Sequence, residues 1–187
     1  YDLAKAETAF KKALQIDSGA LGPRYQIARI HFLAGDYAGA LDLINEELKL
    51  HPDFKRSHYV RGLIYGYRGD FDLAAEDFKM FLEWDPQSWA GHNDLAWIYF
   101  QQGDYLRVEK TARAGLEWNP NNPWLLTSYG VALLNAGKRK AAGTVLVKAL
   151  SAAQKLTLQD WQKAYPGNHP DLASEGLNAI MKTIEMN

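Results

Sequence analysis

A repeat of 34 residues runs through most of the chain. Glycines, leucines, prolines and small residues each recur at this interval. The four series are Gly35, Gly69, Gly103 and Gly137; Leu14, Leu48, Leu82, Leu116 and Leu150; Pro52, Pro86 and Pro120; and Ala28, Gly62, Ala96 and Gly130. Four series that share one interval indicate a true structural period. A period of this length is typical of a tandem array in which each unit is one supersecondary element.

Inside each unit the apolar residues have helical spacing. In the first full unit, two such stretches cover 27–33 and 37–48, with Gly35-Asp36 between them and Pro52 after them. A glycine fits the reversal after a helix, an aspartate can cap the following helix, and a proline ends it. Each unit is therefore predicted to be two antiparallel helices, and no segment has the alternating pattern of a β-strand.

Two segments of the chain resemble tetratricopeptide repeats (TPRs): GDFDLAAEDF at 69–78 and LAWIY at 95–99. Matches to the first-helix signature are Leu95, Ala96 and Tyr99, with Gly62 and Tyr65; matches to the second-helix signature are Ala74, Phe78, Leu82 and Pro86. The early tryptophan of the family is replaced, in successive units, by Arg24, His58, His92 and Leu126. The resemblance implies an all-α fold, an α-solenoid in which antiparallel helix pairs of 34 residues form a right-handed superhelix.

The period and the resemblance together predict six segments. These are 1–18, the second helix of a truncated TPR; 21–54, 55–88, 89–122 and 123–156, four complete TPRs; and 157–187, a partial repeat with a C-terminal capping helix. Because 2–15 has the pattern of a second helix without its first, we expect the natural chain to extend upstream. Thr157-Leu158-Gln159-Asp160 resembles a capping box and is expected to open a short helix.

Composition excludes several functional classes. The 187 residues include 21 Lys and Arg against 22 Asp and Glu, and this balance argues against nucleic-acid binding, which requires an excess of positive charge. The absence of cysteine excludes disulfide scaffolds, thiolate metal sites and cysteine nucleophiles. The charge-free run 118–137 is interrupted by asparagine and proline, so it does not predict a membrane span. We expect a soluble protein, and the sequence does not indicate its compartment.

No motif for catalysis, cofactor binding or metal binding occurs in the sequence, which predicts that the chain is not an enzyme and has no cofactor. His58 and His92 stand one repeat apart, which raises the alternative of a metal site. Because carboxylates are not arranged around them, packing between helices is the favoured interpretation. The acidic pairs Glu46-Glu47 and Glu76-Asp77 are expected on a solvated helix face rather than in a catalytic pair.

Helical geometry predicts where a ligand would bind. In a stacked array of helical hairpins the first helices line the concave wall, and their residues that do not pack on the second helix face the groove. Phe32 and Phe100 also project there, although each can instead pack against a neighbouring repeat. The predicted peptide-binding groove residues are Tyr25, Arg29, Arg56, Tyr59, Leu63, Tyr67, Asn93, Trp97, Gln101, Trp124 and Thr127. Aromatic residues and arginine dominate binding hot spots.

The charge pattern suggests an acidic partner. The first helices of the first two full repeats contain six basic residues and no acid: Arg24, Arg29, Lys55, Arg56, Arg61 and Arg68. Their second helices are mainly acidic, so the inner wall of this half is predicted to be the more positive side. An acidic segment or a terminal carboxylate would then bind near Arg29 and Arg56. The alternative is that these arginines pair with acids of adjacent helices.

The resemblance predicts a non-catalytic protein-protein interaction scaffold that binds a peptide or protein segment in its groove. One alternative is a self-associating module, a homo-oligomer joined through 2–15 or through the C-terminal cap. Another is a regulatory appendage of an enzyme domain that lies upstream. The carboxylate clamp that grips chaperone tails is not matched in either possible register; in the first, its positions hold Tyr25, Arg29, Val60, Ala90 and Asp94.

Overall fold

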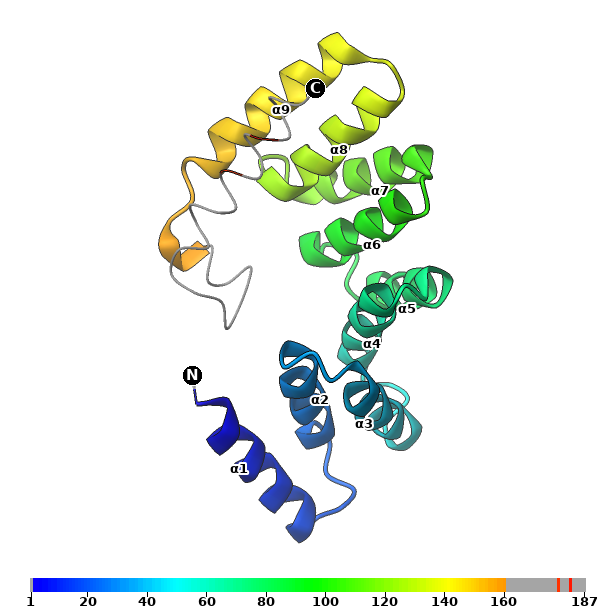
Figure 1. Cartoon of the computed structure of the whole chain (residues 1–187), viewed down its shortest axis with the longest axis vertical. Coiled ribbons are helices and arrows are strands. Elements are labelled where there is room, and N and C mark those ends of the chain that lie inside the picture. The colour runs from blue at the N-terminus through cyan, green and yellow to red at the C-terminus, as the bar shows by residue number, and fades with distance from the viewer. Residues whose placement is uncertain (1, 161–177, 179–181, 183–187) are drawn as a thin grey trace. The chain divides into compact units, whose positions relative to one another are not determined.

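The computed structural model describes residues 2–160 together with residues 178 and 182. Over these residues the chain forms nine α-helices and no β-strand (Figure 1). The helices are α1 (Leu3–Ile16), α2 (Pro23–Leu33), α3 (Tyr37–Leu50), α4 (Arg56–Arg68), α5 (Phe71–Trp84), α6 (Trp89–Gln101), α7 (Tyr105–Trp118), α8 (Pro123–Asn135) and α9 (Arg139–Ala153). None of the helices in this described part of the chain combines the length and apolarity needed to cross a bilayer.

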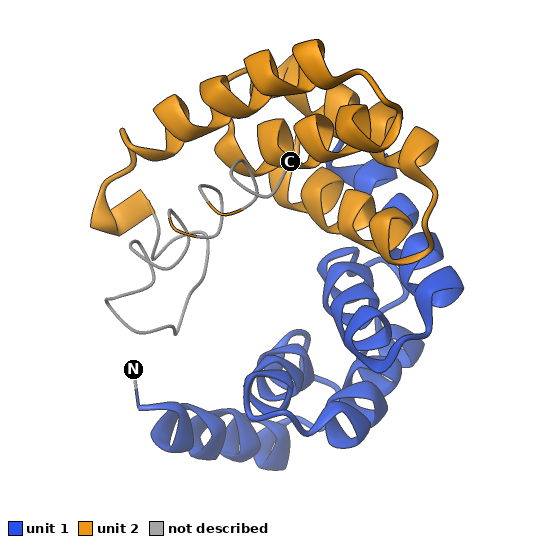
Figure 2. Ribbon diagram, turned by 45° about the horizontal axis from the view of Figure 1, so that its top comes forward, with its two compact units in different colours: residues 1–86 blue, residues 87–187 orange. Residues whose placement is uncertain are grey.

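From α2 onward the helices pack in pairs: α2 on α3, α4 on α5, α6 on α7 and α8 on α9. Residues 1–86 form one compact unit, which contains α1–α5, and residues 87–187 form a second, which contains α6–α9 (Figure 2). In the first unit α1 also packs on α2, and α3 on α4; in the second, α7 packs on α8. Within each unit, therefore, the second helix of one pair lies against the first helix of the next, as in a repeat array.

The four glycines of the 34-residue series lie directly after the first helix of each pair. Their φ angles are positive: 79° for Gly35, 86° for Gly69, 72° for Gly103 and 72° for Gly137. Only glycine adopts this left-handed backbone without a steric penalty. The predicted role of these glycines in the reversal between paired helices is therefore confirmed.

The aspartate that follows the glycine caps the next helix in two of the pairs. The Asp36 carboxylate accepts a hydrogen bond from the Gly39 amide at 3.0 Å, and Asp104 accepts one from the Arg107 amide at 2.9 Å. Asp70 makes no such bond because its carboxylate lies 3.2 Å from Nε of Arg68. The expectation that an aspartate caps the second helix thus fails in this pair.

Small residues in the first helices allow close packing inside each unit. In unit 1 the core is formed by Ala28, Ala40, Ile44, Val60 and Ile64. A Cβ atom added at Gly62 would lie 3.1 Å from the ring of Phe78, and one added at Gly130 in unit 2 would lie 2.5 Å from Leu146. The helices at these two positions therefore pack closely enough that an added Cβ would force the facing side chain to shift.

One polar contact recurs between neighbouring repeats. His51 Nε2 donates to the carbonyl oxygen of Gly19 at 2.9 Å, and Asn119 Nδ2 donates to that of Gln87 at 3.2 Å. Both members of the second pair stand two repeat lengths after those of the first. In both units, therefore, the residue that directly follows the second helix donates a hydrogen bond to the loop before the first helix of the same pair.

The predicted capping box at the start of 157–187 is present. Thr157 Oγ1 accepts a hydrogen bond from the Asp160 amide at 3.2 Å, and the Thr157 amide donates to Asp160 Oδ2 at 2.9 Å. Residues 158–160 are helical, as are residues 178 and 182. The rest of the predicted partial repeat and capping helix lies outside the described residues.

Candidate functional site

The eleven residues predicted to bind a ligand all lie on the first helices of the pairs. They are Tyr25 and Arg29 on α2; Arg56, Tyr59, Leu63 and Tyr67 on α4; Asn93, Trp97 and Gln101 on α6; and Trp124 and Thr127 on α8. Each of the eleven is half-buried or exposed. The opposite sides of the same helices carry fully buried residues such as Ile27, Ile64, Ile98 and Leu125. We call the eleven residues the first-helix surface.

In unit 1 this surface begins with an arginine held over an aromatic ring. The Tyr25 ring meets Phe54 edge-on at 5.2 Å, and the Arg29 guanidinium lies 5.7 Å from the centre of the Tyr25 ring. Arg29 Nη1 also donates to Oε1 of Gln26 at 3.0 Å. Arg56, the first residue of α4, is exposed and makes no ion pair within the described part of the chain. Arg29 is therefore oriented by its neighbours, whereas Arg56 extends into solvent.

The tyrosines of α4 are anchored by rings from neighbouring helices. Tyr59 contacts Phe81 of α5, with ring centres 5.0 Å apart. Tyr67 packs against Phe32 at 5.2 Å and against Tyr37 at 6.0 Å, yet it remains 58% exposed. Phe32 thus packs against a ring of the next repeat. This is the second of the two positions that the sequence left open for Phe32. Phe100 in unit 2 packs against Tyr105 at 5.8 Å and is 40% exposed.

In unit 2, Trp124 of the first-helix surface stacks on a second indole, that of Trp89. The rings of Trp124 and Trp89 lie 4.9 Å apart with an interplanar angle of 19°. Asn93 accepts a hydrogen bond from the Ser128 hydroxyl at 3.4 Å, which links α6 to α8. The Thr127 hydroxyl donates to the carbonyl of Pro123 at 2.8 Å, so its proton is used within its own helix. Sequence analysis did not identify Trp89, because Trp89 and Trp124 do not occupy equivalent positions of the 34-residue period.

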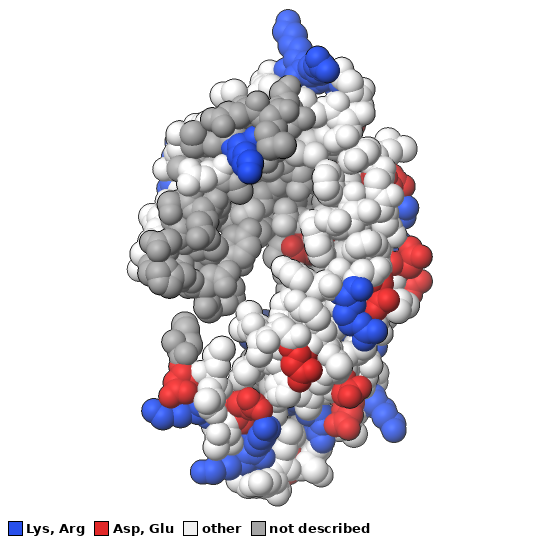
Figure 3. Space-filling view, in the orientation of Figure 1, with Lys and Arg blue, Asp and Glu red and all other residues white. Residues whose placement is uncertain are grey.

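Most of the basic residues predicted for the inner wall of the first half form ion pairs. Arg24 pairs with Glu46 at 3.0 Å, and Arg68 pairs with Asp70 at 3.2 Å. Lys55 lies 3.6 Å from Asp53. Acidic and basic side chains are accordingly interspersed over the face of α1–α3 seen in Figure 3. Arg61 also has an acidic partner, Asp77, so four of the six basic residues are paired. Within residues 2–160, Arg29 and Arg56 are the members of this group that form no ion pair.

Two acids expected on a solvated face are buried. Asp77 is 2% exposed, accepts hydrogen bonds from Arg61 Nε at 2.7 Å and Nη2 at 2.9 Å, and lies 2.8 Å from Nδ1 of His58. The hydrogen bonds to Asp77 raise the pKa of Arg61. Glu47 is fully buried and accepts a hydrogen bond from the Gly22 amide at 2.8 Å. The prediction was therefore wrong for Asp77 and Glu47. Hydrogen bonds from Arg61 compensate Asp77 for its lost hydration, whereas Glu47 accepts the Gly22 bond at Oε1 and its buried Oε2 has no hydrogen-bond partner among the described residues.

His58 has a structural role in this network. Its ring is buried between α4 and α5, where Nδ1 meets the Asp77 carboxylate. Within the described ranges, no three side chains of the metal-binding types come together as a possible metal site. The pairing of His58 with Asp77 accords with the packing interpretation of this histidine.

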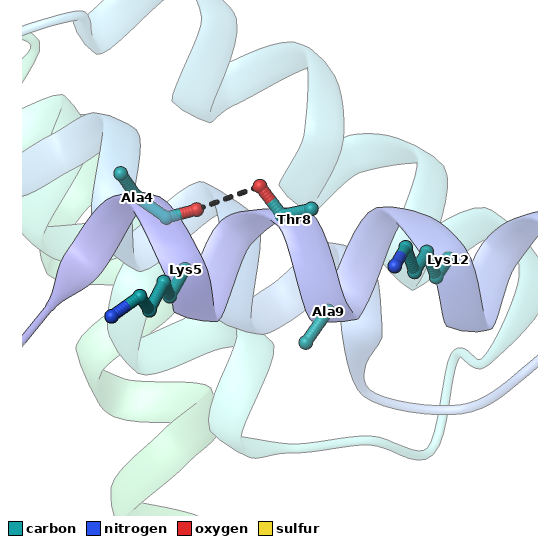
Figure 4. A pocket seen from close by; sticks show the side chains of 5 residues that line it. All are labelled: Ala4, Lys5, Thr8, Ala9 and Lys12. Carbon is teal, nitrogen blue, oxygen red and sulfur yellow. Dashed lines mark hydrogen bonds between the residues drawn. The ribbon is translucent and has the colours of Figure 1, made fainter.

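Helix α1, which corresponds to the second helix of a truncated repeat, is more exposed than the second helices α3, α5, α7 and α9. None of the residues of α1 is fully buried; Leu3 is 39% exposed and Ile16 is 88% exposed. Its contact with α2 includes a bond of 3.3 Å between Glu7 and Nε2 of His31. A hollow of about 320 Å³ lies along α1 and is lined by Ala4, Lys5, Thr8, Ala9 and Lys12. Figure 4 shows how these five side chains lie along the helix.

Comparison with protein families gives matches that together cover about two thirds of the sequence. Two family models, both described as tetratricopeptide repeat, match residues 1–64 and residues 59–123. The co-chaperone DNJ1 of Cryptococcus neoformans var. grubii serotype A, named as containing tetratricopeptide repeats and a J domain, is 29% identical over 77 residues. The matched segment covers 41% of this chain and only 15% of the length of the relative.

Comparison with solved structures gives matches over most of the chain. A crystal structure of MamA has a TM-score of 0.75 at 18% identity and covers 82% of this chain and 90% of its own. MamA (41-end) from Desulfovibrio magneticus RS-1 has a TM-score of 0.74 at 16% identity, with coverages of 81% and 86%. YrrB, described as a TPR protein with an unusual peptide-binding site, has a TM-score of 0.69 at 17% identity, with coverages of 94% and 92%. At these identities the similarity concerns the fold alone.

Proposed function

Since the chain belongs to the tetratricopeptide repeat family and has its all-α solenoid fold, we propose that it is a non-catalytic scaffold that binds a peptide or protein segment on its first-helix surface. The family and the fold indicate a protein interaction scaffold in general. The choice of surface, the absence of catalysis and the acidic character of the partner are parts of the proposal.

The observation that carries the proposal is the two-sided character of the first helices. Each packs one side into the core and leaves the other accessible, and the accessible sides are rich in tyrosine, tryptophan and arginine. Several of these rings already pack against neighbours, such as Tyr59 on Phe81 and Trp124 on Trp89. Binding would therefore immobilise few additional side-chain torsions, which favours affinity because less conformational entropy is lost.

The two units offer different chemistry to a partner. In unit 1, Arg29 and Arg56 can donate hydrogen bonds to the carboxylate of an acidic side chain or a chain terminus, since neither forms an ion pair with a described residue. In unit 2, the rings of Trp97 and Trp124 supply apolar area, while Asn93 and Gln101 can bond to the backbone of an extended or helical segment.

A selection from random phage-displayed peptides tests this proposal and does not require that the natural partner be identified. Peptides selected on the wild type would be titrated against Tyr25→Ala/Arg56→Ala in unit 1 and Trp97→Ala/Trp124→Ala in unit 2. The matched control is Asp42→Ala/Glu117→Ala, which alters exposed residues of the second helices α3 and α7. Circular dichroism would establish that each variant is folded.

The proposal predicts that at least one first-helix variant loses the selected peptides and that the control binds as the wild type does. Enrichment of aspartate or glutamate in peptides that need Arg56 would support an acidic partner. Equal binding by all four proteins would contradict the proposal.

Self-association is a second candidate function, favoured by the exposure of α1. This helix has no fully buried side chain, and Leu3 and Ile16 present apolar surface to solvent. Light scattering over a concentration series would reveal a rise in mass if α1 joins two copies, and Ile16→Lys would abolish that rise. A constant monomer mass would contradict self-association.

A further inference from the structure

A second apolar surface lies on α5, away from the first-helix surface. Leu73, Met80 and Trp84 are 46%, 42% and 52% exposed. Residues separated by seven and eleven positions align along one side of an α-helix, so the three side chains form a stripe about 16 Å long. We call Leu73, Met80 and Trp84 the α5 stripe. The Trp84 ring also packs against Phe81 at 5.8 Å, which fixes one end of the stripe.

The fold of the repeat does not require this stripe. The equivalent residues in the other complete repeats are Gly39, Arg107 and Ala141 for Leu73; Glu46, Ala114 and Lys148 for Met80; and Leu50, Trp118 and Ala152 for Trp84. A large apolar residue occupies all three positions only in α5. Contiguous exposed apolar surface of this kind marks interaction sites more often than scattered single residues do.

The charges beside the stripe specify the kind of partner. Glu76 follows Leu73 by three residues, and Glu83 follows Met80 by three, so both glutamates border the stripe on its solvent side. Both are exposed, and neither forms an ion pair within the part of the chain that the structure describes. Asp77 borders the other side, where Arg61 neutralises it. Lys79 lies between the two glutamates, which leaves one excess negative charge along this border.

We propose that the α5 stripe is a docking surface for a basic amphipathic helix of a partner protein. Apolar side chains of that helix would pack on Leu73, Met80 and Trp84, and its lysines or arginines would pair with Glu76 and Glu83. A second copy of this chain is a poorer fit through its basic helix α9, which exposes a single large apolar residue, Val147. Pairing through its other basic helix, α1, is distinguished by the light-scattering outcome below. The proposal does not depend on peptide binding by the first helices.

A synthetic helix can serve as the probe. We would use a fluorescein-labelled peptide of about 18 residues, or five helical turns, with leucines along one face and lysines elsewhere. A second peptide with glutamate at every lysine position controls for the sign of the charge. Fluorescence anisotropy would give the dissociation constant of each peptide for the wild type and for four variants.

Two variants alter the α5 stripe and two are controls. Met80→Ala removes the apolar contact without adding an acidic group that would attract the peptide. It should weaken binding of the lysine peptide more than about 30-fold, as loss of a hot-spot residue does. Glu76→Gln/Glu83→Gln should weaken it about 2- to 30-fold, the sum of two surface ion pairs. Asp42→Asn/Glu117→Gln removes the same charge elsewhere, and Tyr25→Ala alters the first-helix surface at a ring that packs on Phe54. Both controls should bind as the wild type does.

The pattern of results decides the proposal. It is supported if the lysine peptide binds the wild type, loses affinity with both α5 variants and keeps it with both controls. It is overturned if the lysine peptide does not bind, if the glutamate peptide binds equally well, or if the Asp42→Asn/Glu117→Gln control loses as much affinity as Glu76→Gln/Glu83→Gln. Light scattering that showed a dimer abolished by Met80→Ala would instead assign the stripe to a second copy of the chain.

Discussion

Arg61 donates two hydrogen bonds to the carboxylate of Asp77, from Nε at 2.7 Å and from Nη2 at 2.9 Å. Its third nitrogen, Nη1, donates to the side-chain oxygen of Asn45 at 3.0 Å. One guanidinium therefore connects α3, α4 and α5, and it compensates a carboxylate that would otherwise be buried without a counter-charge.

Replacement of Arg61 by leucine should lower the free energy of unfolding by about 3 kcal/mol, because Asp77 would remain buried without its counter-charge. The midpoint of urea denaturation measures this loss. Arg68→Leu is the matched control, since its pair with Asp70 is exposed and should contribute less than about 1 kcal/mol. Equal losses in the two variants would show that burial of Asp77 does not determine the effect.

Two glycines of the last repeat should respond in opposite ways to replacement by alanine. A Cβ atom at Gly130 would lie 2.5 Å from Leu146, so Gly130→Ala should destabilise the protein by about 1–3 kcal/mol through overpacking. Gly143 lies within α9 with no atom within 4 Å of the added Cβ, so Gly143→Ala should stabilise by about 0.5–1 kcal/mol. Thermal denaturation of both variants checks the two signs; destabilisation by Gly143→Ala would contradict this account.

Stability should fall in acid partly through two capping aspartates. The amide of Gly39, and then His31, lower the pKa of Asp36; the amide of Arg107, and then its side chain, lower the pKa of Asp104. Because these values are depressed in the folded state, the stabilisation is complete above the ordinary aspartate pKa of about 3.9 and is lost as the pH falls through the lower folded values.

Asparagine at both positions keeps a capping oxygen but removes the titration. Asp36→Asn/Asp104→Asn should therefore depend less steeply on pH than the wild type between about pH 5 and pH 2. Urea midpoints measured across this range test the prediction, with Asp42→Asn as a control on the exposed face of α3. A double variant whose pH curve runs parallel to that of the wild type would count against it.

The charge of Arg56 should contribute to the binding of an acidic peptide once such a peptide has been selected. Arg56→Gln should weaken binding about 2- to 5-fold, the usual effect of one exposed ion pair, and should also reduce the dependence of affinity on salt. Calorimetric titrations at two salt concentrations would measure both effects. Lys49→Gln, on the exposed side of α3, is the control for net charge.

The helical pairs could be predicted because the signals that define them are local and recur. Gly69 lies where the chain reverses, with φ of 86°, and Gly62 lies where Phe78 approaches most closely. Each of these residues has counterparts at the same interval in the other units, so the register survived even where single motif residues were replaced. Backbone geometry and close packing leave a signature at fixed spacing, whereas the choice of ion-pair partner does not.

The burial of Glu47 shows where prediction from local pattern failed and which signal was present. A glutamate on a polar-looking stretch of helix suggests a solvated face, yet the equivalent residues in the next three repeats are Phe81, Gly115 and Ala149. That comparison indicates a buried position. The hydrogen bond from the Gly22 amide to one oxygen of this carboxylate depends on tertiary structure and has no sequence signal.

The candidate site was predicted only in part for a similar reason. Tyr25 and Trp124 lie half-buried on first helices, and their role in binding stays a prediction. Helical geometry did not predict the stacking of Trp124 on Trp89 or the anchoring of Tyr67 by Phe32, because ring contacts depend on the spacing of helices from different repeats.

The lack of fully buried side chains in α1 has a consequence for how the chain opens. Local unfolding costs little where few apolar groups leave water, so the amides of residues 3–16 should exchange with deuterium long before those of α4. Glu7 and His31 would then separate while the core around Ile44 and Ile64 stays closed. Any contact made through α1 could thus be released without melting the helices that follow it.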